Sequence, residues 1–157
     1  MSTSTSTVAK AFDGRKKTYY ESTNTECYIG MDFGLSLTVK VRRFKFISKM
    51  IWRDNSKVLQ GARFEGSNDM NNWTTLVTVD QSVHRGWNVL KTKVKEYFRY
   101  IRFAHDQRSQ CSLGELRLFG VRRVVMNIDL TSVVSPVTYV DPFNSIVFAS
   151  SAAVEYR

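Results

Sequence analysis

The stretch that decides the fold is residues 64–69, which read Phe-Glu-Gly-Ser-Asn-Asp, together with Trp73 and Leu76 just after them. Phe64 would face a core, and Gly, Ser, Asn and Asp are the residues that tight turns favour. The apolar positions from Trp73 onward then begin a second strand. This pattern predicts a strand, a polar turn and a second strand, with Phe64 and Trp73 in the core of a β-sandwich.

Further strands are predicted on both sides of this hairpin, at 27–33, 37–47, 97–103 and 116–121. The segment 37–47 alternates apolar and polar residues in its first half and then changes phase, which indicates a long strand with a bend. No segment shows a helical period over eleven or more residues. The sequence therefore predicts an all-β fold.

The length and composition fit one globular domain. The chain has 157 residues, of which 43% are hydrophobic and 24% charged, and a chain of this size can bury a sizeable core. The uncharged run of residues 130–140 is too short to cross a bilayer as a helix. We therefore expect no transmembrane segment.

The net charge is +9. Such a balance suits an acidic partner, such as nucleic acid, anionic lipid or sulfated glycan. However, the Lys and Arg residues are dispersed along the predicted strands, as on the solvent face of an alternating sheet. This second interpretation is favoured, so the sequence does not favour nucleic acid as the partner.

The two cysteines, Cys27 and Cys111, are far apart and do not form a metal-binding pattern. They are either two buried thiols or one disulfide bond. A bond between them would close a loop of about 84 residues, which the chain-entropy model values at roughly 4 kcal/mol.

The two ends of the chain differ in character from its centre. Residues 1–7 form a polar Ser/Thr segment that predicts a flexible leader without a secretory pattern. The chain would then be cytoplasmic or part of an assembly if Met1 is native, and extracellular or surface-bound if it is a processed fragment. Residues 122–157 contain two apolar runs, 133–140 and 145–149, around an Asp-Pro turn. This segment is either the start of a second β domain or an arm that contacts other protein subunits.

Several short motifs occur together in this chain, and their order is informative. They are Ala11-Phe12-Asp13-Gly14, Thr18, Met31-Asp32-Phe33-Gly34, the stretch 64–69, and Gly114 to Gly120. With these motifs, residues 8–121 resemble the coagulation factor 5/8 type C (discoidin-like) domain of the galactose-binding-like superfamily. The resemblance implies a jelly-roll β-sandwich, with 122–157 as a β-rich C-terminal extension.

The same resemblance implies a structural calcium ion near the start of the domain. In this chain the carboxylate of Asp13, the carbonyls of Lys10 and Arg15, the carbonyl and hydroxyl of Thr18, and Glu115 from the closing strand would hold it. Calcium takes six to eight oxygen ligands, which a tight loop around a glycine can supply. The alternative is that Asp13 and Thr18 only cap a turn and that Glu115 pairs with an arginine.

The resemblance also implies that loops at one end of the sandwich hold the ligand. The candidate residues fall in two segments, and they are Trp52, Arg53 and Asn55, then His84, Arg85 and Trp87. An aromatic ring suits the apolar face of a pyranose, and planar donors suit its paired hydroxyls. The chain departs from the sugar-binding pattern at Lys49, where relatives have an arginine.

Two functions remain open from the sequence. The first is a non-catalytic recognition or attachment module that binds a glycan or another surface ligand, as in cell adhesion. The second is a structural subunit of a larger assembly that uses the sandwich and its tails for protein contacts. An enzyme is not expected, because no paired carboxylates, activated nucleophile or phosphate-binding loop is visible.

Overall fold

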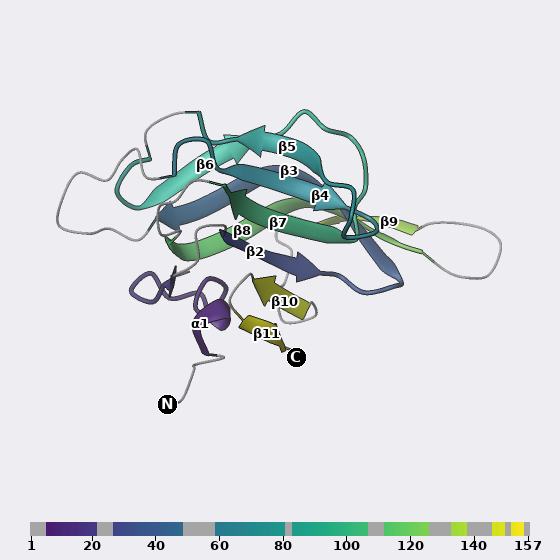
Figure 1. Cartoon of the computed structure of the whole chain (residues 1–157). Coiled ribbons are helices and arrows are strands. Elements are labelled where there is room, and N and C mark those ends of the chain that lie inside the picture. Colours follow the sequence, from purple (N-terminus) through teal and green to yellow (C-terminus); the bar gives the residue numbers. More distant parts are fainter. Residues whose placement is uncertain are drawn as a thin grey trace.

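The computed structural model places two antiparallel β-sheets face to face, with one short helix beside them (Figure 1). It describes residues 6–21, 27–48, 59–80, 83–106, 112–125, 133–137, 146–149 and 152–155. The helix is α1 (Ser6–Ala9), and it begins inside the segment predicted as a flexible leader. The all-β, jelly-roll prediction is confirmed in the sheets.

Sheet A has the strand order β1-β8-β3-β6, with β9 also paired to β8. Its strands are β1 (Tyr20–Glu21), β3 (Leu37–Ser48), β6 (Trp87–Lys91), β8 (Ser112–Val124) and β9 (Val133–Val137). Sheet B has the order β11-β10-β2-β7-β4-β5. Its strands are β2 (Cys27–Asp32), β4 (Arg63–Ser67), β5 (Thr74–Thr78), β7 (Tyr100–His105), β10 (Ile146–Ala149) and β11 (Ala152–Glu155).

The long strand β3 bends as the sequence predicts. Its pairing with β8 shifts register between Val41 and Arg43 and again between Ile47 and Ser48. The first shift inserts Arg42 into β3 and the second inserts Gly114 into β8. Such a bulge bends its strand, and the extra Arg42 changes which positions of β3 face inward. Phe44 and Phe46 therefore both face the core and are buried.

The core lies between the two sheets and is rich in aromatic residues. Phe64 stacks on Phe44 with ring centroids 4.2 Å apart and also contacts Phe46 and Phe103 at 5.6 and 5.2 Å. All four rings are almost completely buried. This cluster joins β4 and β7 of sheet B to β3 of sheet A, so it holds the two layers together.

The predicted hairpin forms as β4 and β5, but Trp73 is not in the core. Between Phe64 and Glu65 the pairing shifts, so Thr75 lies opposite Glu65 on the outer face. Trp73 is two positions before Thr75 and therefore lies on that same outer face. It is half-buried, with the Arg102 guanidinium 3.8 Å from its ring centre.

The turn of this hairpin is fixed by Asp69. Its carboxylate accepts hydrogen bonds from the backbone amides of Asn71 and Asn72 and from the Asn72 side chain, at 2.7–2.9 Å. These bonds hold the pKa of Asp69 well below its usual range, with the Asn72 amide as the largest cause. The polar residues 67–72 therefore build the turn that the sequence predicts.

The described strands of the C-terminal segment pair with both sheets. β9 runs antiparallel to the end of β8, and β10 runs antiparallel to β2 along its length. β11 pairs with β10, and α1 lies beside this hairpin (Figure 1).

β8 itself continues to Val124, past the predicted boundary at 121, because its last residues pair with the first residues of β3. The Asp-Pro turn predicted at 141–142 lies outside the described residues.

His105 ends β7 and is 1% exposed, so its side chain is buried at the end of the strand. Asp106 is exposed and forms an ion pair with Arg63 at 2.7 Å.

Within the described part of the chain, no helix is long and apolar enough to cross a membrane.

Candidate functional site

The loop between α1 and β1 folds back on Asp13. Oδ1 of Asp13 accepts a hydrogen bond from the Arg15 amide at 2.8 Å. Oγ1 of Thr18 lies 2.8 Å from both carboxylate oxygens of Asp13 and 2.9 Å from the Arg15 carbonyl oxygen. One hydroxyl proton can serve only one of these acceptors. The Thr18 hydroxyl therefore lies near three oxygen acceptors, but its single proton can satisfy one of them.

Glu115 of β8 lies against this loop and is hydrogen-bonded to it. The Leu116 amide donates to the Ala11 carbonyl at 2.7 Å, and the Gly14 amide donates to Oε2 of Glu115 at 3.0 Å. Gly14 adopts φ 77, a conformation that favours glycine. Residues far apart in sequence, 14 and 115, thus meet in one site.

Glu115 is fully buried, and its second oxygen is not satisfied. Oε1 has no hydrogen-bond partner and lies 3.5 Å from Nε of Arg117. Burial raises the pKa of Glu115 to about 7, and the nearby negative charge of Asp13 acts in the same direction. A buried carboxylate with an unpartnered oxygen is costly unless something positive satisfies it.

The loop has the hydrogen bonds of a turn cap and Glu115 pairs with Arg117, but the same residues also offer oxygens to a cation. Asp13, Arg15 and Thr18 supply oxygens on one side, and Glu115 supplies a buried, unpartnered oxygen on the other. This is the hard-oxygen ligand set that calcium takes. Lys10 begins the loop and is half-buried, but no contact links it to Asp13 or Glu115.

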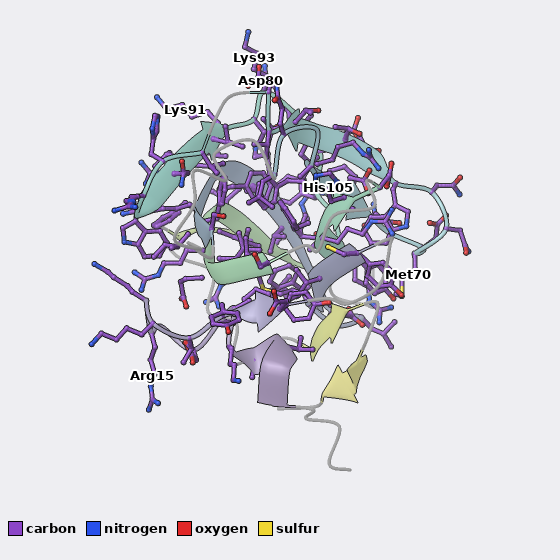
Figure 2. The ribbon with its side chains drawn as sticks, turned by 60° about the vertical axis from the view of Figure 1, so that its left-hand side comes forward. Arg15, Met70, Asp80, Lys91, Lys93 and His105 are labelled. Atoms are coloured by element: carbon purple, nitrogen blue, oxygen red, sulfur yellow. The ribbon has the colours of Figure 1, made fainter. Side chains whose placement is uncertain are left out.

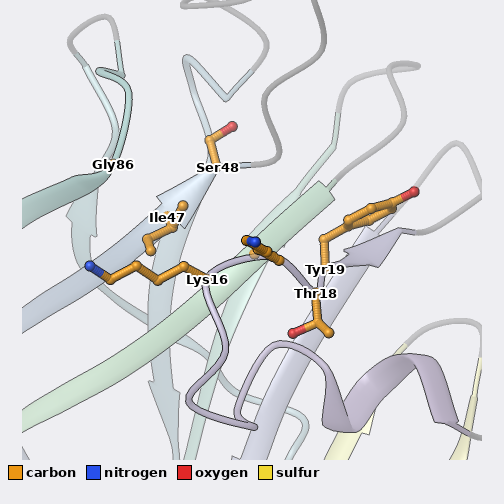
Figure 3. A pocket seen from close by; sticks show the side chains of 8 residues that line it. Lys16, Thr18, Tyr19, Ile47, Ser48 and Gly86 are labelled. Atoms are coloured by element: carbon orange, nitrogen blue, oxygen red, sulfur yellow. The ribbon is translucent and has the colours of Figure 1, made fainter.

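A pocket of about 360 Å³ lies next to this loop, which we call the loop-end pocket (Figure 3). Four separate segments form it: the loop before β1, the end of β3, the turn before β6 and the start of β8. Its lining residues are Lys16, Lys17, Thr18, Tyr19, Ile47, Ser48, Gly86 and Gly114. Ser48 is the last described residue before the segment 49–58.

The turn before β6 is fixed by Asn88. Its side chain accepts a hydrogen bond from the His84 amide at 2.7 Å and donates to the carbonyls of His84 and Gly86 at 3.0 and 3.1 Å. Asn88 is buried, whereas His84 and Arg85 are exposed. The turn therefore holds the exposed His84 and Arg85 in the segment before Gly86, and of these three residues Gly86 lines the loop-end pocket.

Trp87 follows this turn and is half-buried on the outer face of sheet A. Nζ of Lys45 lies 4.8 Å, and Cζ of Arg117 4.7 Å, from its ring centre. Because two cations already lie against the ring, Trp87 is less open as a sugar platform than the sequence suggests.

The other predicted ligand residues, Trp52, Arg53 and Asn55, lie outside the described residues. Tyr19 is not among the predicted ligand residues, but it is 39% exposed and lines the pocket. The sequence feature that could have identified it is its position directly after the predicted metal ligand Thr18.

Cys27 is disulfide-bonded, and Cys111, the chain's other cysteine, lies outside the described residues.

The fold has counterparts among carbohydrate-binding modules. CBM62 from Clostridium thermocellum Xyl5A matches with a TM-score of 0.65 and 27% identity, covering 73% of this chain and 83% of that one. CpGH89CBM32-5 from Clostridium perfringens, in complex with GalNAc-β-1,3-galactose, matches with a TM-score of 0.57 and 15% identity, over 71% and 81%. The CBM32 of AlyQ, in complex with 4,5-unsaturated mannuronic acid, matches with a TM-score of 0.52 and 17% identity, over 71% and 84%. No protein-family model and no curated protein matches the sequence.

Proposed function

Because this chain has the discoidin-like, galactose-binding-like fold, we propose that it is a non-catalytic module that binds a glycan in the loop-end pocket. The observation that carries the proposal is the pocket itself, which lies where four segments meet at one end of the sandwich. Its volume falls in the range of small-molecule sites. The comparisons do not support the alternative, a structural subunit of an assembly.

The chemistry of the pocket wall suits a sugar. Tyr19 offers an exposed aromatic ring for the apolar face of a pyranose, and Lys16 and Lys17 offer ammonium donors for its hydroxyls or an acidic group. His84 and Arg85, just before Gly86, add exposed polar groups from a turn that Asn88 holds in place. Two structural neighbours hold a galactose-containing disaccharide and a uronic acid in their complexes.

The pocket is tested by removing its exposed ring. We expect Tyr19→Ala to weaken binding of the best ligand from a glycan array about tenfold or more, because the ring contributes most of the apolar contact. The matched control is Tyr28→Ala, since Tyr28 is 37% exposed but lies on sheet B. Titration calorimetry on both variants measures the difference.

Two results would contradict the glycan proposal. One is a wild-type protein that binds no glycan on the array, and in particular one that self-associates in size-exclusion chromatography instead. The other is a Tyr28→Ala variant that loses as much affinity as Tyr19→Ala, which would place the ligand elsewhere.

We also propose that Asp13, Arg15, Thr18 and Glu115 hold a structural calcium ion. The support is the unpartnered buried oxygen of Glu115 opposite the acceptor-rich Asp13 loop. Bound there, calcium would add positive charge beside the buried carboxylate, next to the Arg117 guanidinium that lies 3.5 Å from Oε1. Since Gly14 and Glu115 lie at opposite ends of the domain sequence, the ion would fasten the start of the domain to its closing strand.

Calcium is expected to stabilise the protein in a pH-dependent way. The pKa of Glu115 rises from 4.5 to about 7 in the metal-free fold. The contribution of Glu115 to stability is therefore fully present below pH 4.5 and is lost as the pH rises through 7, by up to about 3 kcal/mol. Millimolar calcium should restore it at pH 8, raising Tm by several degrees, and should have little effect at pH 5.

The control for this prediction separates Glu115 from other carboxylates. Glu115→Gln should abolish both the pH dependence and the calcium response, whereas Glu96→Gln, on an exposed residue, should keep both. Differential scanning fluorimetry with and without a chelator gives the readout. An unchanged Tm in calcium at pH 8 would remove the metal from the proposal.

A further inference from the structure

The two sheets differ in whether their cationic side chains are paired with carboxylates. On the outer face of sheet B, Arg63 and Arg102 both contact the carboxylate of Glu65, at 2.8 and 2.7 Å. Where β2 ends and β7 begins in the same sheet, Arg99 forms two hydrogen bonds of 2.7 Å with Asp32. The described arginines of this sheet are therefore neutralised by neighbouring carboxylates.

The outer face of sheet A carries positive charge without such partners. Phe44, Phe46 and Leu118 point into the core, so the alternating positions Arg43, Lys45 and Arg117 point outward. Lys40 lies between the buried Val39 and Val41 and also points outward, and Arg123 lies opposite Thr38. We call Lys40, Arg43, Lys45, Arg117 and Arg123 the basic face.

Glu115 is the one acidic residue in the described strands β3, β6 and β8. It is fully buried below the Asp13 loop, and Arg117 is the residue of the basic face that it approaches. The described residues place no carboxylate in salt-bridge distance of Lys40, Arg43, Lys45 or Arg123. The positive charge of this face is therefore available to an external anion.

Aromatic rings hold these cations in place. Lys40 and Arg123 lie 5.0 and 3.9 Å from the ring centre of Tyr97. Arg43 lies 4.6 Å from the ring centre of Phe119. With the Trp87 contacts of Lys45 and Arg117, each cation of the basic face rests on a ring. Such contacts order a long side chain without neutralising its charge.

An unsatisfied donor adds an independent sign of a missing partner. Nε of Arg123 is a buried atom without a hydrogen-bond partner within the described structure, whereas Nε of Arg117 lies 3.5 Å from Oε1 of Glu115. Buried donors are normally satisfied, so each such atom calls for an explanation. Guanidinium groups that are ordered but unpaired suit carboxylate or sulfate oxygens, which they bind in a planar fork.

We propose that the basic face binds an extended acidic polysaccharide, whose carboxylate or sulfate groups meet these cations in turn. The cations follow β3 and β8 from the pair Thr38 and Arg123 to the pair Lys45 and Arg117. At the rise of a strand this distance is roughly 20 Å. That length spans several sugar units, so one chain would contact all of the cations.

The geometry favours a polysaccharide over other polyanions. Single-stranded nucleic acid binds by stacking its bases on open aromatic rings, but here the rings carry cations. Anionic membranes are bound by exposed apolar residues beside basic ones. On the described strands of this face, Val89 is the one large apolar residue that is strongly exposed. Recognition by charge alone fits a sulfated or carboxylated chain.

This second surface goes beyond the loop-end pocket and does not depend on it. The test uses Lys40→Gln and Lys45→Gln together, which keep the aliphatic parts of the side chains but remove two charges. The matched control combines Lys93→Gln and Lys95→Gln, two exposed residues away from these contacts. Figure 2 shows Lys93 pointing away from the body of the molecule.

The probes are polygalacturonate and dextran sulfate, with neutral dextran, a single-stranded oligonucleotide and phosphatidylserine vesicles as comparisons. We expect the wild type to bind one or both acidic polysaccharides, with an affinity that falls as salt rises. The variant Lys40→Gln/Lys45→Gln should lose about tenfold or more of that affinity, whereas the control Lys93→Gln/Lys95→Gln should change less than about twofold. Tm of each variant confirms that it folds.

The outcomes also separate this proposal from the pocket. Tyr19→Ala should leave polysaccharide binding at the basic face unchanged. Equal loss in both double variants would mean that only net charge matters and would overturn the proposal. Binding of the oligonucleotide or the vesicles in preference to both acidic polysaccharides would also overturn it.

Discussion

Replacing Phe64 with alanine is expected to lower the free energy of unfolding by about 3–5 kcal/mol. Phe64 is fully buried and contacts Phe44, Phe46 and Phe103, so its loss leaves a cavity between the two sheets. For a domain of this size the change corresponds to a fall in Tm on the order of 10 °C. Urea denaturation followed by tryptophan fluorescence measures it.

Phe64→Leu is the matched control, because it keeps an apolar side chain and leaves a smaller cavity. Its cost should be less than half that of Phe64→Ala. A loss below about 1 kcal/mol for Phe64→Ala would show that this cluster is not what joins the sheets.

Gly120→Ala is expected to be about as damaging, for a different reason. A Cβ atom at residue 120 would lie 2.1 Å from the carbonyl oxygen of Lys40 and 3.0 Å from Cα of Val41. These are backbone atoms of the neighbouring strand, so no side chain can rotate away. The strands β3 and β8 would have to separate next to the shift between Val41 and Arg43. We expect a loss of about 3 kcal/mol or more.

Gly114→Ala gives the comparison within the same strand. There the nearest atom to the new Cβ would be the Ile47 carbonyl oxygen, at 3.2 Å. A shift of a few tenths of an ångström relieves this contact, so the cost should be clearly smaller than at Gly120. If the two alanine variants unfold at the same urea concentration, the close approach of β3 and β8 does not limit stability.

Much of the fold follows from local patterns in the sequence. The alternation in 37–47 predicts β3 and its bend, and the turn residues at 64–69 predict the hairpin of β4 and β5. The prediction that Trp73 lies in the core is wrong. It rests on the apolar character of the ring, whereas the odd spacing from the buried Leu76 puts Trp73 on the opposite face of the strand. Residue type alone therefore does not show which face of a strand a large side chain occupies.

The site was predictable only in part. The short motif around Asp13 and Gly14 pointed to the loop, and the resemblance pointed to Glu115. The loop-end pocket could not be predicted, because four segments form it and only the folded chain brings Tyr19 next to Ser48 and Gly86. The separation of paired from unpaired cations was equally hidden, since it depends on which residues lie opposite one another across the strands.

The difference in charge pairing between the sheets gives the molecule an electric dipole that points through its thickness. In the field of an acidic chain, this dipole would produce a torque during approach, so that sheet A turns toward the chain before any contact forms. Oriented approach raises the fraction of productive collisions and hence the association rate constant, and added salt would remove that advantage.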